Sequence, residues 1–348
     1  MTKEYIDLRS DTLTKPCTTM RKVMTEAEVG DDVYGEDPTV KKLEDMAAQK
    51  LGKEAALFVS SGTMGNLIAV LTHTARGDEI ILEESSHIFA FEVGGLAALA
   101  GVMPNTIKGE KGKISAEQLQ KAIKPENIHY PKPTLLCLEN SSNFGGGTVL
   151  TLEEMDALTE TAHKNNLKVH LDGARIFNAA VSLNVPVSRL VKDVDSIMFC
   201  LSKGLGCPVG SMLAGSKEFI ERARKYRKML GGGLRQAGVL AAAGIYSLEQ
   251  LVDRLADDHV AARRLAEGIN QIPGLSVDLN TVETNIVMAD ITKEGLTSGK
   301  LSHFMQEEGI LVITVNEKRI RLVTHRDVSS QDIETALAKI KYIMSNLR

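Results

Sequence analysis

Tryptophan is absent from the 348-residue sequence, and aromatic residues make up only 4% of it. The four cysteines include no CxxC pair and no spacing typical of a zinc site. We therefore expect free thiols in a reducing compartment, most of them small buried residues, and we predict no metal site. Because a chain of this length can bury a large core, small disulfide-stapled scaffolds are excluded.

Long hydrophobic runs and an excess of basic charge are also missing. The longest apolar stretch, 93–103, is well short of the ~20 residues of a membrane-spanning helix, and the first residues lack the apolar centre of a signal peptide. Lys and Arg number 41 against 45 Asp and Glu, a net charge of −4, which disfavours a nucleic-acid groove because such a groove needs concentrated positive charge. We expect a cytoplasmic protein that binds neither membranes nor nucleic acid.

The pattern of apolar residues predicts a mainly parallel α/β sheet. After residue 30, short runs that are apolar at successive positions alternate with longer segments of helical periodicity. This alternation is typical of a doubly wound domain, in which ligands bind beyond the carboxyl ends of the strands. The expected strands are 55–60, 79–82, 135–138, 167–171 and 196–201, and the expected helices lie near 39–51, 63–75, 86–100, 115–124, 151–166 and 216–229.

A smaller α+β domain is predicted to follow. Residues 235–272 have a helical pattern, and we expect a long helix here to join the two domains. Strands are expected at 274–279, 284–289 and 318–324, and helices near 297–309 and 329–346. The predicted organisation is an N-terminal arm at 1–30, a large domain at 31–245 and a small domain at 246–348.

Polar residues follow three of the expected strands. Ser61-Gly62-Thr63 opens a helix whose free N–H groups suit a phosphate, although the same residues also make an ordinary N-cap. Asp172 and Arg175 follow the strand at 167–171, as functional groups or as a pair that caps the next helix. Lys203 enters a glycine-rich turn after 196–201, which suggests a large group beside it.

This set of groups fits one cofactor, pyridoxal 5'-phosphate. Its aldehyde requires an amine, its ring nitrogen requires a carboxylate to stay protonated, and its phosphate requires N–H and hydroxyl donors. Longer segments then carry a family resemblance. They are IDLRSDT (6–12), GDDVYGEDPTV (30–40), HLDGARIFNA (170–179), LSKGLGCPVGS (201–211), RKMLGGGLRQAGVLAAAGIY (227–246) and RLVTH (321–325).

In this order, across nearly the whole chain, the segments resemble the low-specificity L-threonine aldolase family. Members are pyridoxal-phosphate enzymes with the aspartate aminotransferase fold, fold type I. The resemblance implies retro-aldol cleavage of threonine, allo-threonine and related β-hydroxy-α-amino acids to glycine and an aldehyde. Another reaction on the same scaffold, β-elimination or transamination, stays open, as does a pyridoxal-phosphate-binding protein without catalysis.

The resemblance also implies roles for single residues near the cofactor. Lys203 matches the lysine joined to the aldehyde, Asp172 the partner of the ring nitrogen, and Ser61-Gly62-Thr63 the phosphate turn. His87 matches a histidine stacked on the ring, although by itself it is more typical of a cap or core residue. His87, His129 or a held water is the candidate base for the β-hydroxyl proton.

Further residues are matched to the substrate and to a second subunit. Ser10, Arg175 and Arg321 match the groups that hold the substrate carboxylate, and a guanidinium suits this role because its fork meets a carboxylate bidentately. Tyr34 and His129 match residues of the substrate pocket, although packing or surface exposure would also explain them. Lys228 and Arg235 match residues that reach the phosphate of a neighbouring subunit, which implies a homotetramer with shared active sites.

Two positions depart from the family pattern. After Glu139-Asn140 many members carry Thr-His, whereas this chain has Ser141-Ser142. An imidazole that could reach the substrate is therefore missing, which bears on stereochemical preference at the β-carbon. Lys132 stands where an arginine is common, which is a milder change.

Overall fold

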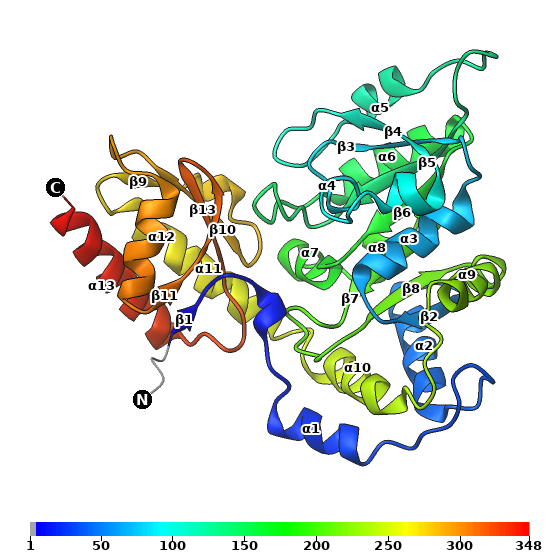
Figure 1. Ribbon diagram of the computed structural model, residues 1–348, viewed down its shortest axis with the longest axis horizontal. Coiled ribbons are helices and arrows are strands. Elements are labelled where there is room, and N and C mark those ends of the chain that lie inside the picture. Colours follow the sequence, from blue (N-terminus) through cyan, green and yellow to red (C-terminus); the bar gives the residue numbers. More distant parts are fainter. Residues whose placement is uncertain (1–4, 348) are drawn as a thin grey trace.

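The computed structural model describes residues 5–347, and a seven-stranded sheet forms its centre (Figure 1). The strand order is β2-β8-β7-β6-β5-β3-β4, and neighbours run parallel except that β8 is antiparallel to both β2 and β7. The strands are β2 (Ala55–Val59), β3 (Glu79–Glu83), β4 (Met103–Ile107), β5 (Pro133–Glu139), β6 (Lys168–Asp172), β7 (Ser196–Cys200) and β8 (Ser211–Gly215). The predicted mainly parallel α/β sheet is confirmed.

Helices cover both faces of this sheet, which explains why its strands are apolar at successive positions. Along β7, Ile197 and Phe199 belong to the core on one face, and Met198 and Cys200 to the core on the other. The first core is formed with helices α2 (Pro38–Leu51), α6 (Leu152–Lys164), α7 (Ile176–Leu183) and α10 (Gly238–Gln250). The second core is formed with α3 (Gly62–His73) and α9 (Lys217–Met229).

Three details of the large sheet differ from the expectation. Strand β4 was not predicted because it lies at the sheet edge, where Met103 is exposed and Pro104 interrupts the apolar pattern. Strand β8 was not predicted because small residues and glycine dominate its five positions. The expected helix at 86–100 is wrong: Val93 and Gly94 have φ of 55° and 71°, so the segment forms α4 (His87–Ala90) and a separate turn of π-helix, η2 (Leu96–Ala100).

The remaining chain forms a second, smaller core. An antiparallel sheet of order β12-β13-β10-β9 packs with α11 (Leu255–Asn270), α12 (Ser298–Glu307) and α13 (Ser330–Asn346). The expected long helix at 235–272 is divided into α10 and α11. The strands are β9 (Leu275–Ser276), β10 (Ile286–Ile291), β12 (Ile313–Asn316) and β13 (Arg319–Val323). A smaller α+β unit is thus present, and the exact boundary at 245/246 stays a prediction.

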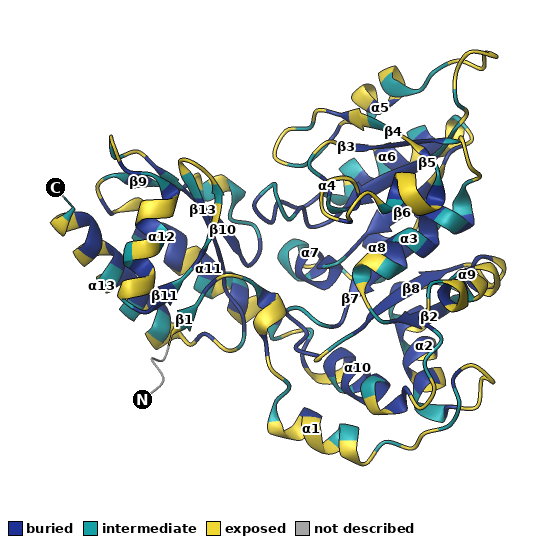
Figure 2. Cartoon of the chain, viewed as in Figure 1, coloured by how far each residue is buried: buried dark blue, intermediate teal, exposed yellow. Residues whose placement is uncertain are grey.

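The N-terminal arm crosses to the small unit. Its strand β1 (Ile6–Asp7) pairs in parallel with β11 (Ile310–Leu311), and α1 (Thr18–Thr25) then packs on α10. The first four residues of the predicted arm lie outside the described part of the chain. Figure 2 shows buried residues concentrated in the sheets and on the inner faces of the helices. Among residues 5–347, no helix has the length and apolar character needed to span a bilayer.

Candidate active site

A cavity of about 180 Å³ lies at the carboxyl ends of β5, β6 and β7, where the alternating pattern placed the ligand site. Lining residues come from the start of α3, from α4 and from the segments after three strands. The predicted residues that the structure brings together here are Ser61, Gly62, Thr63, His87, Asp172, Arg175 and Lys203. Residues separated by more than a hundred positions in the sequence therefore share one cavity.

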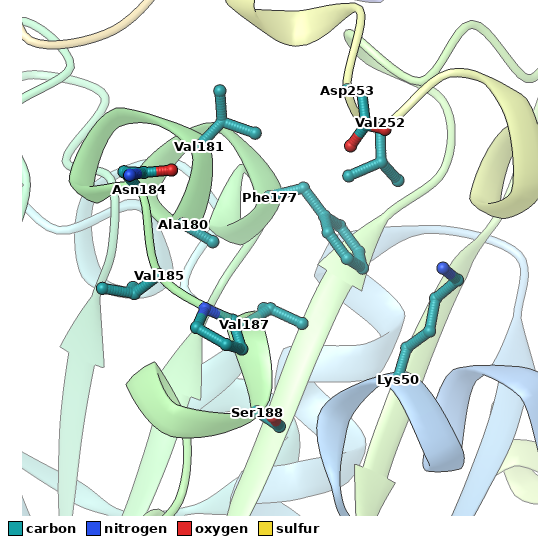
Figure 3. A pocket seen from close by; sticks show the side chains of 11 residues that line it. Lys50, Phe177, Ala180, Val181, Asn184, Val185, Val187, Ser188, Val252 and Asp253 are labelled. Atoms are coloured by element: carbon teal, nitrogen blue, oxygen red, sulfur yellow. The ribbon is translucent and has the colours of Figure 1, made fainter.

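A wider hollow of about 540 Å³ opens elsewhere on the large domain (Figure 3). Its lining consists mainly of valine, alanine and other side chains without nucleophilic or acid–base groups, drawn from α7 and from α8 (Val187–Leu190). Lys50 and Asp253 are its charged members, and they lie at its rim in Figure 3. This hollow is larger than the cavity at the strand ends, but the groups that could do chemistry lie in the smaller cavity.

Lys203 and Asp172 are held by different means. The turn after β7 is fixed because the Lys203 carbonyl accepts hydrogen bonds from Thr14 Oγ1 at 2.9 Å and from the Gly206 N–H at 2.8 Å. Within the described chain the Lys203 amine has no hydrogen-bond partner, so it is available to a ligand. Asp172 ends β6 and is 2% exposed; its Oδ1 accepts from the Ala174 N–H at 3.0 Å and its Oδ2 from Asn66 Nδ2 at 2.9 Å.

His87 stands at the start of α4 in an acidic environment. Its backbone N–H donates to Glu139 at 2.7 Å, and its Nδ1 lies 3.0 Å from Glu92 Oε1. The hydrogen bond to Glu92 raises the pKa of His87. Burial raises the pKa of Glu92, and burial together with the nearby Asp172 charge raises the pKa of Glu139 to about 7. The imidazole is thus oriented through Nδ1, which leaves Nε2 for a ligand.

His87, Glu92 and Asp172 also carry ligand atoms that lie within 4.8 Å of one another, as a metal site would require. Each of these groups is already engaged in the hydrogen-bond network. Asn66 Nδ2 donates to both carboxylates, at 2.8 Å to Glu92 and 2.9 Å to Asp172, and Glu92 is also bonded to His87. The network accounts for the cluster without a metal, and the absence of a metal site stays a prediction.

The turn Ser61-Gly62-Thr63 serves as an N-cap, and it also offers free donors. Ser61 Oγ accepts from the Met64 N–H at 3.2 Å, so one of the unpaired N–H groups of α3 is satisfied. The N–H groups of Gly62 and Thr63 have no partner in the described chain and lie at the positive end of the helix. A Cβ at Gly62 would lie 3.0 Å from Cys200 Sγ, so glycine permits the close approach of turn and strand.

Arg175 is not paired with Asp172, so the predicted alternative of an Asp172–Arg175 cap is wrong. Its Nε and one terminal nitrogen each donate to Asp11 at 2.7 Å, and both side chains are almost fully buried. Burial alone would raise the pKa of Asp11, but the Arg175 charge and hydrogen bonds hold it well below its ordinary value. Most of the guanidinium fork is therefore committed to this ion pair.

Replacement of Arg175 by alanine should consequently destabilise the fold. It would leave Asp11 buried without a countercharge, a change that costs about 3–5 kcal/mol of unfolding free energy. Because the folded-state pKa of Asp11 is lowered, the stabilisation is fully present above the ordinary value of 3.8 and is lost as pH falls further. Urea unfolding of Arg175→Ala at neutral pH measures the loss. Unchanged stability would show that the ion pair does not hold the site.

Arg321 is the freer of the two arginines. One terminal nitrogen donates to Asn143 Oδ1 at 3.0 Å, the other donates to the Arg9 carbonyl at 3.3 Å, and its buried Nε has no partner among the described residues. Burial and the neighbouring Arg175 charge lower the pKa of Arg321 to about 10, so it remains a cation at neutral pH. Asn143 also accepts from the third nitrogen of Arg175, at 3.2 Å. A carboxylate arriving beside Asn143 would meet both arginines.

Other predicted site residues do not line the cavity within one chain. Ser10 lies nearby in the arm, where its hydroxyl oxygen accepts from the Thr12 N–H and caps a short 3₁₀ turn. Tyr34 is 76% exposed, and His129 and Lys228 are also exposed. Arg235 is exposed and paired with Asp31 at 3.2 Å. The roles predicted for these residues stay predictions.

The two positions that depart from the family pattern also lie in different environments. Ser142 is 3% exposed, and its Oγ accepts from the Gly145 N–H at 3.1 Å, so the hydroxyl shapes the loop after β5. Ser141 lines the cavity, and its buried hydroxyl has no partner in the described residues. Lys132 is exposed and lies outside the cavity lining. In this loop Ser141 therefore lines the cavity, whereas the Ser142 side chain is hydrogen-bonded within the loop itself.

Several site residues were not predicted as such. Asp11 lies inside a segment that carries the family resemblance and Asn66 inside the expected helix at 63–75, but no role was assigned to either. Glu139 and Asn143 follow an expected strand, so the strand-end rule that selected Asp172 could have selected them too. Glu92 carried no such signal, because it lay inside a helix that the structure does not form.

The chemistry of these donors fits pyridoxal 5'-phosphate. One cavity holds a free amine at Lys203, a buried carboxylate at Asp172 and unpaired N–H groups at Gly62 and Thr63. These are the groups that the aldehyde, the ring nitrogen and the phosphate require. The orphaned hydroxyl of Ser141 and the aromatic face of His87 complete a polar cavity for a flat, charged molecule.

Comparisons with known proteins agree over nearly the whole chain. A family profile described as β-eliminating lyase matches residues 7–294. Low-specificity L-threonine aldolase 1 of Arabidopsis thaliana is 45% identical over 100% of this chain and 99% of its own length, and the low specificity L-threonine aldolase of Escherichia coli K12 is 42% identical over 96% and 97%. A solved threonine aldolase of Leishmania major matches with a TM-score of 0.85 at 19% identity, covering 97% of this chain and 99% of that one. This structural likeness confirms the fold.

Proposed function

The chain belongs to the β-eliminating lyase family and, within it, to the low-specificity L-threonine aldolases, and from this premise we propose how its cavity works. It cleaves L-threonine, L-allo-threonine and related β-hydroxy-α-amino acids to glycine and an aldehyde, with pyridoxal 5'-phosphate as cofactor. The observation that carries this proposal is the placement of Lys203 and Asp172 in one cavity, beside the free N–H groups that open α3.

Each cofactor-binding residue has a defined task. When bound, pyridoxal phosphate supplies an electron sink for the pair released at the substrate Cα. Lys203 provides the amine that holds the aldehyde carbon, and the N–H groups of Gly62 and Thr63 hold the phosphate. The Asp172 carboxylate would hold the ring nitrogen of the cofactor, and Asn66 fixes the orientation of that carboxylate.

Orientation of the substrate selects the bond that breaks. Arg321, with the remaining nitrogen of Arg175, binds the substrate carboxylate beside Asn143, and Ser10 lies in the adjoining arm. Fixing the carboxylate fixes rotation about the substrate N–Cα bond. The Cα–Cβ bond is then held in the one direction that favours retro-aldol cleavage over proton loss at Cα.

His87 is the better placed of the two candidate histidine bases. It lines the cavity, its Nδ1 is bonded to Glu92, and its free Nε2 can take the β-hydroxyl proton. His129 is exposed and outside the cavity in a single chain. A base oriented by a carboxylate keeps one tautomer, as general-base catalysis requires.

Arg321→Ala should weaken substrate capture rather than the fold. Loss of one charge-assisted contact is worth about 1.5–3 kcal/mol, or roughly a 10- to 150-fold rise in KM for threonine. Initial rates over a range of threonine concentrations measure this. An unchanged KM in Arg321→Ala would remove the arginine from the carboxylate site.

Incubation with threonine and allo-threonine separately tests the proposed activity. We expect glycine and acetaldehyde in equal amounts without an added keto acid. Release of ammonia with an oxo acid would instead indicate β-elimination, and a requirement for a keto acid would indicate transamination. Binding of the cofactor without any turnover of either substrate would point to a non-catalytic protein. The ratio of the two rates also reports the effect of Ser142 at the position where many members carry histidine.

A homotetramer with shared active sites is part of the proposal. Tyr34, His129, Lys228 and Arg235 are exposed in the single chain, which is the placement expected of residues that serve a neighbouring subunit. If Arg235 acts across an interface, mixing inactive Lys203→Ala subunits with Arg235→Ala subunits should restore partial activity, because some mixed sites carry both native residues. Failure of mixed subunits to recover activity, after exchange is verified by mass, would place each site within one chain.

A cytoplasmic location belongs to the same proposal. All four cysteines are free, and three of them are buried. Free thiols suit a reducing compartment, because an oxidising one favours disulfides. Fractionation of the cells that make the protein tests this.

A further inference from the structure

A chain of hydrogen bonds runs from Asp172 away from the cavity. Asn66 Nδ2 lies 2.9 Å from Asp172 Oδ2, and Asn66 Oδ1 lies 3.1 Å from His170 Nε2. His170 Nδ1 lies 2.8 Å from Ser196 Oγ, which in turn lies 2.8 Å from His73 Nε2. Asn66, His170 and Ser196 are at most 1% exposed. The links from Asp172 to Ser196 are therefore shielded from water, and the last link, at the half-buried His73, is partly buried.

The hydrogen bond between Asn66 and Asp172 determines which atom is the donor in each of the following hydrogen bonds. The NH₂ group of Asn66 faces two carboxylates, Asp172 and Glu92, so its Oδ1 must be the atom that faces His170. His170 Nε2 must then carry a proton and donate it. Burial lowers the pKa of His170 to about 3, so the ring is neutral and its Nδ1 is an acceptor. Ser196 donates its single hydroxyl proton to that acceptor.

The last link is determined in the same way. Since the hydroxyl proton of Ser196 is used on His170, its oxygen accepts from His73, and His73 Nε2 carries a proton. Burial lowers the pKa of His73 to about 4, so this ring is also neutral. All four hydrogen bonds are thus donated in one direction, toward the carboxylate of Asp172. Aligned donors of this kind polarise one another in a medium of low dielectric constant.

The chain of hydrogen bonds runs along the centre of the large sheet, from Asp172 at the carboxyl end of β6 to Ser196 at the start of β7 and His73 at the end of α3. His73 is the last residue of α3, beside a hollow of about 420 Å³ that Lys168 and Asp195 also line. Ser196 is the first residue of β7 and is paired in register with His170 of β6. His73 is further held by stacking on Phe219, with ring centroids 4.5 Å apart. These hydrogen bonds thereby connect α3, β6 and β7. The phosphate turn opens α3, Asp172 ends β6, and Lys203 follows β7.

We propose that His170, Ser196 and His73 are positioning residues that act through Asn66 to fix the direction of the Asp172 carboxylate. This inference rests on the proposed function, because it assigns the chain to the residue that faces the cofactor ring nitrogen. A carboxylate held by aligned donors faces the ring nitrogen without the cost of reorienting water. A misdirected carboxylate would not keep the ring nitrogen protonated, so kcat depends on these residues although they do not line the cavity.

A matched pair of serine variants separates this role from simple packing. Ser196 and Ser211 are both fully buried, on the neighbouring strands β7 and β8, but the Ser211 hydroxyl has no partner among the described residues. Each alanine substitution removes one buried oxygen, and only Ser196→Ala interrupts the chain. We expect Ser196→Ala to lower kcat about 3- to 10-fold with KM for threonine unchanged, and Ser211→Ala to retain kcat.

A second pair of variants covers the case in which Ser196→Ala does not fold. His73→Phe keeps a flat ring against Phe219 but removes the donor to Ser196, and it should lower kcat as well. His73→Gln restores an N–H donor and should recover most of that loss. Recovery by an amide, which cannot reproduce the ring stack, would identify the hydrogen bond as the active feature. Equal kcat losses in both His73 variants would contradict the proposal.

Nitrogen NMR of the histidine rings in the protein without cofactor supplies a readout independent of activity. We expect His170 and His73 to be neutral with the proton on Nε2, and Ser196→Ala to alter the His170 signals whereas Ser211→Ala leaves them unchanged. A proton on Nδ1 of His170 would overturn the proposal, and so would equal kcat values for the two serine variants. Failure of the proposed function has a different signature, since the unmodified protein would then cleave neither threonine nor allo-threonine.

Discussion

Lys203→Ala is expected to lower kcat/KM for threonine by on the order of 10³-fold or more, to the limit of detection. Lys203 carries the one primary amine among the described residues that line the cavity, no hydrogen bond occupies it, and the cofactor aldehyde requires an amine in that position. The fold should be retained, because the turn is held through the Lys203 carbonyl by Thr14 and Gly206 rather than through the side chain. Acetaldehyde release measures the rate, and thermal unfolding measures the fold.

The same variant separates covalent attachment from binding. The N–H groups of Gly62 and Thr63 remain in Lys203→Ala, so some pyridoxal phosphate should still bind, but borohydride should no longer fix it to the protein. Lys341→Ala, which changes an exposed lysine on α13, is the control and should keep both activity and borohydride labelling. Threonine cleavage by Lys203→Ala at the unmodified rate would disprove the assignment, as would labelling of a different residue.

Asp172→Asn is expected to produce the second largest effect, about 10²- to 10⁴-fold in kcat. The substitution preserves the shape of the side chain but removes its charge. Asp172 accepts from the Ala174 N–H on one oxygen and from Asn66 on the other, and an amide has only one oxygen to offer these two donors. The ring nitrogen would lose the charge that keeps it protonated, and the local hydrogen bonds would lose one acceptor.

The control for Asp172→Asn is a charge change elsewhere on the same scaffold. Asp156→Asn removes a half-exposed carboxylate on α6 that is paired with Arg189 and does not line the cavity, and it should leave kcat unchanged. Cofactor absorbance shows whether Asp172→Asn still binds pyridoxal phosphate, so that loss of rate is distinguished from loss of cofactor. If Asp172→Asn retained kcat with the cofactor bound, the carboxylate would not be the partner of the ring nitrogen.

The two arginines show that residue identity alone does not predict the partner of a charged side chain. Both are matched to the substrate carboxylate by resemblance, and a guanidinium in sequence carries no sign of its partner. In the structure Arg175 gives two of its nitrogens to the buried Asp11, whereas Arg321 keeps a buried Nε without a partner. Asp11 and Arg175 are 164 positions apart. They meet only because the N-terminal arm folds back onto the segments that follow β6 and β7.

The histidines likewise have hydrogen-bond partners that the sequence did not predict. His87 was identified by family resemblance, and its orienting partner Glu92 was hidden because the segment at 86–100 read as one continuous helix. The positive φ at Val93 and Gly94 ends that helix and lets Glu92 turn back to the imidazole. His170, one residue of a predicted strand, gave no sign in sequence that it is linked to Asp172 through Asn66.

The sequence by itself determined the α/β class, most of the strands and the residues that end them, because burial on both faces of a parallel sheet leaves unbroken apolar runs and places ligands at the strand ends. It also pointed to the cofactor, because a phosphate turn, an acid and an amine follow three of the strands in that order along the sequence. Only the tertiary structure decided which charges are paired internally and which remain free for a ligand. Whether a buried charge is paired depends on contacts between segments distant in sequence. A local sequence pattern does not specify these contacts.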